Sequence, residues 1–254
     1  MAPGHSLSGL ALGLGVASLP FFGFNLVDIA LIGILLAGAA LLPDLDIPMS
    51  TASTLFWPRR LNLKQIYNPV SIFIEKICVF VYQSTSTPKD IYRHGGHRTL
   101  THTIAFGLFF GGIVWVSSSI LYINYAISFV LICLALRGVF AKYTGRHGKP
   151  FVYLISSVPI ALMPLGYIDP LNPLLLAIIV TLGIIIHNLG DGITNSGIPF
   201  LWPVKIKGQR WYRFKLPLFE TGSDFEKIFV NNFFRFIILA IIFYNVYPLG
   251  EASL

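Results

Sequence analysis

The feature that most constrains this chain is its series of long apolar runs, separated by stretches rich in proline, glycine or basic residues. A helix of roughly 20 predominantly apolar residues crosses the hydrocarbon core of a bilayer. A chain of 254 residues has room for about seven such helices and one long polar loop. The runs predict transmembrane helices at about 7–22, 26–42, 102–119, 124–136, 151–168, 173–190 and 228–248.

The composition excludes an ordinary soluble domain. Hydrophobic residues make up 55% of the chain and charged residues 11%, whereas soluble domains have about 25% charged residues. We therefore expect an all-α polytopic membrane protein whose residues 1–254 form a single membrane-embedded domain. Arg235 lies inside the last predicted helix, and its long side chain is expected to reach back to the membrane interface.

The longest polar region covers 49–96 and contains one further apolar segment. Residues 70–83 carry Glu75 and Lys76 at their centre, so the segment is too short and too charged to cross a bilayer. An apolar face beside charged residues is typical of a helix that lies in the membrane interface. We expect such an amphipathic helix here, within a long cytoplasmic loop.

The distribution of lysine and arginine predicts the orientation in the membrane. Seven follow the second predicted span, four follow the fourth and six follow the sixth, and the remaining one is Arg235. Because basic loops stay in the cytoplasm, we expect the N-terminus and these loops on the cytoplasmic side. The tail 250–254 is expected on the opposite side.

The net charge of +7 bears on the partners. The basic residues are confined to loops between apolar runs, where anionic lipid headgroups or the topology rule account for them. We expect membrane lipids as partners and no nucleic acid, and the sequence leaves the oligomeric state open. Cys78 and Cys133 lie in apolar stretches without a CxxC pair, so they are expected to be small buried residues.

Three polar clusters lie at the ends of apolar runs, all on the predicted cytoplasmic face. Asp44 and Asp46 follow Pro43 in what we expect to be an extended turn, where alternate side chains point the same way. His187 and Asp191 are four residues apart at the end of a predicted helix and therefore share a face. The full set of candidate metal ligands is His5, Asp44, Asp46, His97, His102, His187 and Asp191.

Each cluster alone has an ordinary explanation. An aspartate after proline is common in turns, and His187 with Asp191 could cap a helix. Arg98 could be a topology charge, with Thr99 or Thr101 as the cap of the helix that follows. The coincidence of all three clusters on one face favours metal binding instead. Histidine and carboxylate ligands without a thiolate suit Zn²⁺ best and Mn²⁺ as an alternative.

At these clusters the sequence resembles the YdjM-like family of bacterial inner-membrane proteins, described as LexA-regulated metal-dependent hydrolases. The matching stretches are LLPDLDIP at 41–48, GHRTLTHT at 96–103, HNLGDGIT at 187–194 and GIPFLWP at 197–203. The resemblance extends to about residue 227. It implies a metal-dependent hydrolase embedded in the inner membrane, with one to three divalent ions.

The chain departs from the family pattern at two positions. The family usually has histidine where this chain has Ile47, and glycine where it has Thr99. The histidine missing at Ile47 leaves the number of bound ions open. The family is distantly similar to zinc-dependent phospholipase C and P1 nuclease, which cleave phosphodiesters. This analogy favours a phosphoester as the bond that is cleaved, although function does not follow from a fold.

These features predict hydrolysis of a phosphoester in an anionic lipid or lipid-linked substrate at the cytoplasmic face. Bound Zn²⁺ would lower the pKa of its water toward about 7. Among the predicted catalytic residues, Arg98 would balance charge on a phosphoryl oxygen and Asp46 or Asp191 would accept the proton. The basic loops would concentrate an anionic lipid at the site.

Two other classes of function remain open on the residues alone. A divalent-metal transporter would also place ionisable residues in membrane spans. Against it, the opposite half of the predicted helices offers little beyond Asp28 and Asp169 to continue an ion path. A non-catalytic membrane scaffold is the third class, in which the loops would matter more than the histidines.

Overall fold

The described residues form eight α-helices, and their only strands are two strands of two residues each that pair in a hairpin. The computed structural model describes residues 2–55, 60–61, 64–65, 68–90, 96–141, 143, 148–220 and 222–251. The helices are α1 (Ala2–Ala17), α2 (Leu26–Ala39), α3 (Pro69–Thr85), α4 (Ile104–Ser118), α5 (Leu121–Val139), α6 (Lys149–Leu162), α7 (Pro173–Gly192) and α8 (Asn231–Glu251). The all-α prediction is therefore confirmed.

Short elements join these helices. The 3₁₀ turns are η1 (Pro20–Phe22), η2 (Pro43–Asp46) and η3 (Leu100–His102), and the π-helical turn η4 (Glu226–Val230) leads directly into α8. The antiparallel hairpin pairs β1 (Arg60–Leu61) with β2 (Lys64–Gln65). The basic residues Arg59, Arg93, Lys142 and Arg146, which contribute to the predicted topology, and the end of the tail at 252–254 lie outside the described residues.

Four segments are long and apolar enough to cross a membrane: Leu26–Asp46, Leu121–Val139, Pro173–Gly192 and Glu226–Tyr247. The prediction of seven spans is not confirmed. The other three candidates, α1, α4 and α6, have 16, 15 and 14 residues, which is below the usual length of about 17–25 residues for a spanning helix. The predicted interfacial helix corresponds to α3, which carries Glu75 and Lys76.

Two predicted helices have wrong boundaries, and the positions of prolines account for them. The first helix begins at Ala2 and ends at Ala17, because Pro3 is tolerated in a first turn whereas Pro20 cannot continue a helix. His5 therefore lies inside α1 and not in front of it. Helix α6 ends at Leu162, two residues before Pro164, and does not extend to the predicted residue 168.

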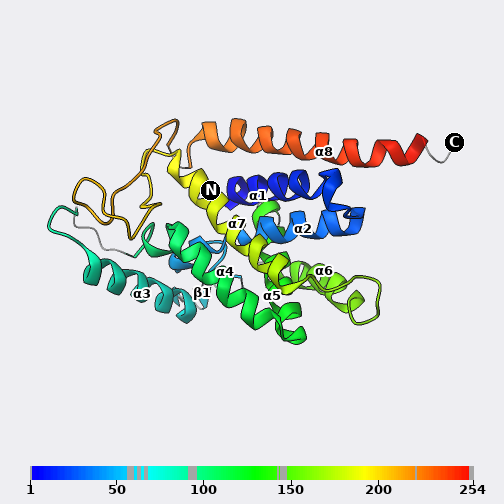
Figure 1. Ribbon diagram of the computed structural model, residues 1–254, viewed down its shortest axis with the longest axis horizontal. Coiled ribbons are helices and arrows are strands. Elements are labelled where there is room, and N and C mark those ends of the chain that lie inside the picture. Colours follow the sequence, from blue (N-terminus) through cyan, green and yellow to red (C-terminus); the bar gives the residue numbers. More distant parts are fainter. Residues whose placement is uncertain are drawn as a thin grey trace.

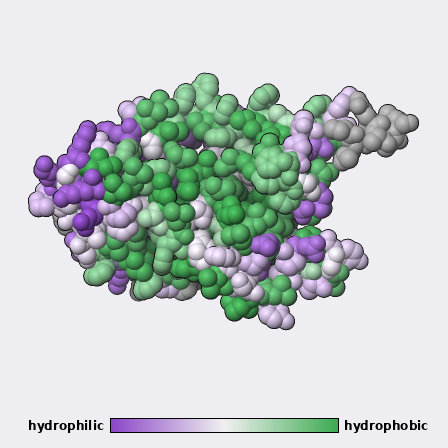
Figure 2. Space-filling view, viewed as in Figure 1, coloured by the Kyte–Doolittle hydropathy of each residue, from purple (hydrophilic) through white to green (hydrophobic). Residues whose placement is uncertain are grey.

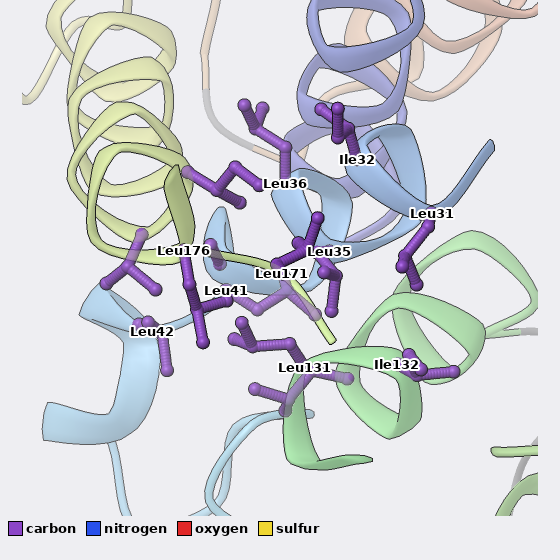
Figure 3. Packing of buried hydrophobic residues seen from close by; sticks show 14 of the residues in the cluster. Leu31, Ile32, Leu35, Leu36, Leu41, Leu42, Leu131, Ile132, Leu171 and Leu176 are labelled. Carbon is purple, nitrogen blue, oxygen red and sulfur yellow. The ribbon is translucent and has the colours of Figure 1, made fainter. Parts of the chain in front are cut away.

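Helix α2 occupies the centre of the bundle and packs against α1, α5 and α7. Leu35 is completely buried, and Figure 3 shows it among leucine and isoleucine side chains of α2, α5 and the start of α7. At Gly38 a Cβ would overlap the carbonyl of Leu131, and at Gly183 it would overlap Ala39. The close packing at Gly38 holds α5 against α2, and that at Gly183 holds α7 beside the end of α2, where the candidate ligands lie.

The polar parts of the chain gather at one end of the bundle. Figure 1 shows the loop between α7 and α8 beside the C-terminal end of α3, while α8 runs along α1 and extends past the other helices. In Figure 2 hydrophobic residues cover most of the visible face, and many of the hydrophilic ones lie at the end with these loops. An apolar belt beside a polar end is the surface expected of a membrane protein.

Candidate metal centre

The seven predicted ligands come together although they belong to four separate segments. His5 comes from α1, Asp44 and Asp46 from η2, and His97 and His102 from η3 and the residues before it. His187 and Asp191 come from the last turns of α7. A continuous series of contacts no longer than 3.8 Å joins all seven side chains. The structure therefore brings all seven side chains together, while their role as metal ligands stays a prediction.

The seven side chains contain two candidate metal-binding groups. The first group is His5, His187 and Asp191, and the second group is Asp44, His97 and His102. Within each group the candidate ligand atoms lie within 4.8 Å of one another. All the members are buried except His97, whose side chain is 37% exposed. His97 therefore forms the solvent-accessible edge of the site.

Asp191 connects the two groups. Its Oδ2 lies 3.4 Å from His102 Nε2 and 3.7 Å from His187 Nε2. The contact to His187 confirms that residues four apart at the end of this helix share a face. The other oxygen, Oδ1, lies 3.4 Å from His5 Nε2 and 2.8 Å from Arg98 Nη2. One carboxylate thus touches three histidines and the only arginine of the site.

Hydrogen bonds direct two nitrogen lone pairs toward each other. His187 Nδ1 donates to the carbonyl of Ala40 at 2.7 Å, which leaves Nε2 without a proton in the neutral ring. The Thr101 hydroxyl donates to Asp46 Oδ2 at 2.7 Å, so its oxygen accepts from His102 Nδ1 at 2.9 Å. The two Nε2 atoms, both lone-pair donors in this arrangement, are 3.2 Å apart. A cation between them would remove their repulsion.

The distances among these atoms fit a tetrahedral ion. Ligand atoms that lie 2.0–2.2 Å from a tetrahedral Zn²⁺ are separated from one another by about 3.3–3.6 Å. The Nε2 atoms of His102 and His187 and Asp191 Oδ2 are separated by 3.2, 3.4 and 3.7 Å, and Asp44 Oδ1 lies 3.8 Å from His187 Nε2. The atoms of His102, His187 and Asp191 therefore suit Zn²⁺ in both chemistry and spacing, and Asp44 lies beside them.

The charges of the site favour a divalent cation as well. Asp44, Asp46 and Asp191 are buried, and Arg98 is the buried cation beside them. With neutral histidines, two negative charges remain uncompensated. Buried charge without a partner is costly, and a divalent ion would balance it.

The two aspartates of η2 do not point the same way, so the predicted extended turn is wrong. Pro43 starts a 3₁₀ turn, and in a helical turn residues two apart lie on different sides. Asp44 faces His187. Asp46 accepts from His97 Nδ1 at 2.9 Å and from Thr101, so both its oxygens bond to groups that orient ring nitrogens. This position behind the ligands is typical of outer carboxylates that position metal-binding histidines.

Asp46→Asn is expected to weaken metal affinity by about 10–100-fold, the usual effect of losing an outer partner of a ligand. The amide keeps an acceptor for Thr101 but loses the charge that aligns His97 and His102. Competition for Zn²⁺ with a chromophoric chelator measures the change. Asp28→Asn, the same replacement in the capping box of α2, is the control. Unchanged affinity in Asp46→Asn, or an equal loss in the control, would contradict the assigned position.

Arg98 is held in an unusual backbone conformation. Its φ is 55°, in the left-handed region that costs a residue other than glycine about 1–3 kcal/mol. The conformation lets the guanidinium reach Asp191 and Thr194. Arg213 donates to the carbonyl of Arg98 at 3.0 Å, which ties this strained residue to the loop before α8. Because Arg98 is buried, a plain topology charge does not explain it.

The loop that carries Arg213 is itself hydrogen-bonded to the segment that follows α3. Asp90 accepts from the backbone N–H of Trp211 at 2.9 Å and of Thr87 at 2.6 Å. Partial burial acts against ionisation, but these hydrogen bonds hold the pKa of Asp90 below its usual value. The contacts are therefore complete at neutral pH and lost only in acid.

Cys78 lies beside the site but belongs to neither candidate metal-binding group. Burial, together with the charge of Asp46, raises the pKa of its thiol to about 11. Its side chain is completely buried, as the sequence predicts for a small core residue. Cys133 is also buried, and both are free cysteines.

Sequence reasoning missed three contributors. Thr101 was considered only as a helix cap, whereas the cap of α4 is Thr103, which accepts from the backbone N–H of Phe106. Thr194 and Arg213 contact Arg98 from beyond the predicted ligands. Among these three residues, only Thr101 has a signal in the sequence, which is its position between His97 and His102.

Comparison with known proteins adds one result. A family model described as YdjM inner membrane protein matches residues 1–250. No curated protein and no solved structure matches the chain.

Proposed function

Because the chain belongs to the YdjM inner membrane protein family, we propose that it is a membrane-bound metal-dependent hydrolase. Its substrate would be a phosphoester of an anionic lipid or lipid-linked molecule at the cytoplasmic face. The observation that carries the proposal is the buried set of histidine and carboxylate ligands, whose lone pairs converge within 3.2–3.8 Å at the ends of membrane helices.

A divalent ion, Zn²⁺ or alternatively Mn²⁺, would activate water near neutral pH and polarise a phosphoryl oxygen. His102, His187 and Asp191 would hold it and leave the fourth tetrahedral position for water, with Asp44 beside His187. The first group adds His5, whose ring stacks on His187 with the ring centroids 3.8 Å apart. The presence of two groups allows for more than one ion.

The other residues would handle charge and protons. The guanidinium of Arg98, fixed beside Asp191, would balance charge that develops on a phosphoryl oxygen. His97 is exposed and hydrogen-bonded to Asp46, so the pair can accept a proton from water, with the carboxylate stabilising the imidazolium. His97 together with Asp46 would therefore accept the proton, and Asp191 would bind the metal.

The test is hydrolysis of phosphatidylglycerol by the full chain reconstituted in liposomes, measured as released phosphorylated headgroup. We expect turnover to vanish after chelation, to return with Zn²⁺ or Mn²⁺, and to rise with pH through about 7. Undiminished turnover in chelator would contradict a metal-dependent reaction. Uptake of Zn²⁺ into the liposomes without hydrolysis would favour the transporter instead.

The structure offers little that favours transport. Asp28 and Asp169 do line one cavity near the start of α2. However, Asp28 accepts from the backbone N–H of Asn25 in a capping box, which explains its presence without an ion.

A further inference from the structure

A cavity of about 210 Å³ lies next to the first metal-binding group. Its walls come from α1, α7, the residue Phe219 and the turn η4 with the start of α8. Most of the lining is apolar, and it includes Ile186, Ile193, Phe219, Val230 and Phe234. His5 and Asp191 of the first metal-binding group line this cavity directly.

A few polar side chains interrupt the apolar lining of the cavity. Two of them are His5 and Asp191, whose Nε2 and Oδ1 atoms are 3.4 Å apart, and Asp191 also contacts His102 of the second group. Glu226 also lines the wall, and its Oε2 accepts from the backbone N–H of Gly222 at 2.6 Å. The apolar remainder would leave a charged headgroup without partners, whereas a hydrocarbon chain needs none.

The η4 and α8 wall of the cavity is exposed on its other side. The segment Glu226–Tyr247 is the least buried of the four candidate spans. Phe229 and Phe233, on its outer side, are 65% and 59% exposed. Helix α8 runs along α1, which carries His5 (Figure 1). A lipid chain on the outer side of α8 would therefore be separated from this candidate ligand by one helix.

The size of the cavity decides how much of a lipid it can hold. Pockets that enclose a whole small ligand measure about 300–1,000 Å³, so 210 Å³ accepts only part of a lipid. One end of the occupant must therefore stay outside, which an amphiphile in a bilayer can do.

We propose that this cavity receives a hydrocarbon chain of the phosphoester lipid and thereby places its polar group against His5 and Asp191. The inference rests on the proposed hydrolysis for the identity of the polar group. We call this cavity the chain site, meaning the site for the hydrocarbon chain. Its apolar lining and its continuity with the first metal-binding group support it independently of turnover.

The test fills the cavity by Val230→Trp and uses Phe229→Trp as the matched control on the same turn. Val230 lines the cavity, whereas Phe229 is exposed and does not. Liposomes contain phosphatidylglycerol with a photoreactive diazirine in its acyl chain or, in a second arm, polyprenyl phosphate with the same group. Peptide mapping measures labelling of residues 186–193, and labelling of the exposed α8 residues Phe236, Leu239 and Phe243 is the internal reference.

We expect Val230→Trp to lower labelling of 186–193 by about tenfold or more relative to the reference, with no change in Phe229→Trp. The arm that labels this segment identifies the kind of chain. Retained Zn²⁺ binding in both variants shows that the ligands stay in place. Equal labelling in the two variants, or none from either probe, overturns the chain site.

Turnover separates this inference from the proposed function. Val230→Trp should lose hydrolysis of the long-chain lipid but keep that of a soluble short-chain analogue. Labelling that disappears in Val230→Trp, without hydrolysis by the unmodified protein, would support the chain site and overturn the hydrolase. Hydrolysis of the long-chain lipid at equal rates in both variants would overturn the chain site and leave the hydrolase standing.

Discussion

His187→Ala is expected to abolish turnover and to lower affinity for Zn²⁺ by more than the roughly 100-fold that marks the loss of an outer partner. The imidazole is completely buried, and its Nε2 lies 3.2–3.8 Å from His102, Asp191 and Asp44. Its removal takes away a nitrogen that contacts three other candidate ligands. Isothermal titration with Zn²⁺ and the liposome assay measure the two effects.

Controls distinguish a lost ligand from a damaged fold. Asn124→Ala removes a different buried polar side chain, which donates to the carbonyl of Leu171, and should leave Zn²⁺ affinity unchanged. Added imidazole should restore part of the metal binding in His187→Ala, because the vacated space lies against the ring of His5. Full turnover in His187→Ala would show that this histidine is not a ligand.

Arg98→Met is expected to destabilise the chelator-treated protein by about 3–5 kcal/mol, the usual effect of removing one partner of a buried ion pair. Arg98 and Asp191 are both buried, and Nη2 lies 2.8 Å from Oδ1. Without the guanidinium, the carboxylate has lost its only charged neighbour of opposite sign at such short range. Unfolding by denaturant in detergent measures the loss, which should shrink when Zn²⁺ is bound.

A double-mutant cycle tests the cause of that loss. Combining Arg98→Met with Asp191→Asn should recover much of the stability, since the unpaired charge is gone. Arg235→Met is the control, because Arg235 donates only to the exposed side chain of Asn232 and such surface contacts are worth about 0–1 kcal/mol. If the double variant is as unstable as the sum of the single variants, the pair does not account for the position of Arg98.

The sequence predicted the all-α fold class, and it singled out the seven side chains that the structure brings together. Apolar runs predicted the long helices other than α3, because a helix that crosses lipid is apolar over about 20 residues. Clusters at the ends of runs were expected to meet, and His102 does contact His187 and Asp191. That prediction used only the expected orientation of the helices in the membrane, because the ends of alternate spans then lie on the same side.

The finer geometry depends on contacts that the sequence does not show. Asp44 and Asp46 differ in role because a 3₁₀ turn replaces the expected extended one, and either backbone fits a segment between Pro43 and Pro48. The apolar cavity depends on the π-helical turn at Glu226–Val230, for which no periodicity in the sequence gives a signal. The number of spans does not follow from apolar composition alone, because α1, α4 and α6 are apolar but short.

Direct observation of bound zinc tests the central claim, which is that these histidines and carboxylates form a metal centre. The measurement is zinc content and Zn K-edge X-ray absorption of the full chain in lipid nanodiscs after removal of excess metal. We predict at least one Zn²⁺ per chain, with imidazole nitrogen and carboxylate oxygen at about 2.0–2.2 Å. A protein that retains no zinc, or a spectrum dominated by sulfur at about 2.3 Å, would contradict the account.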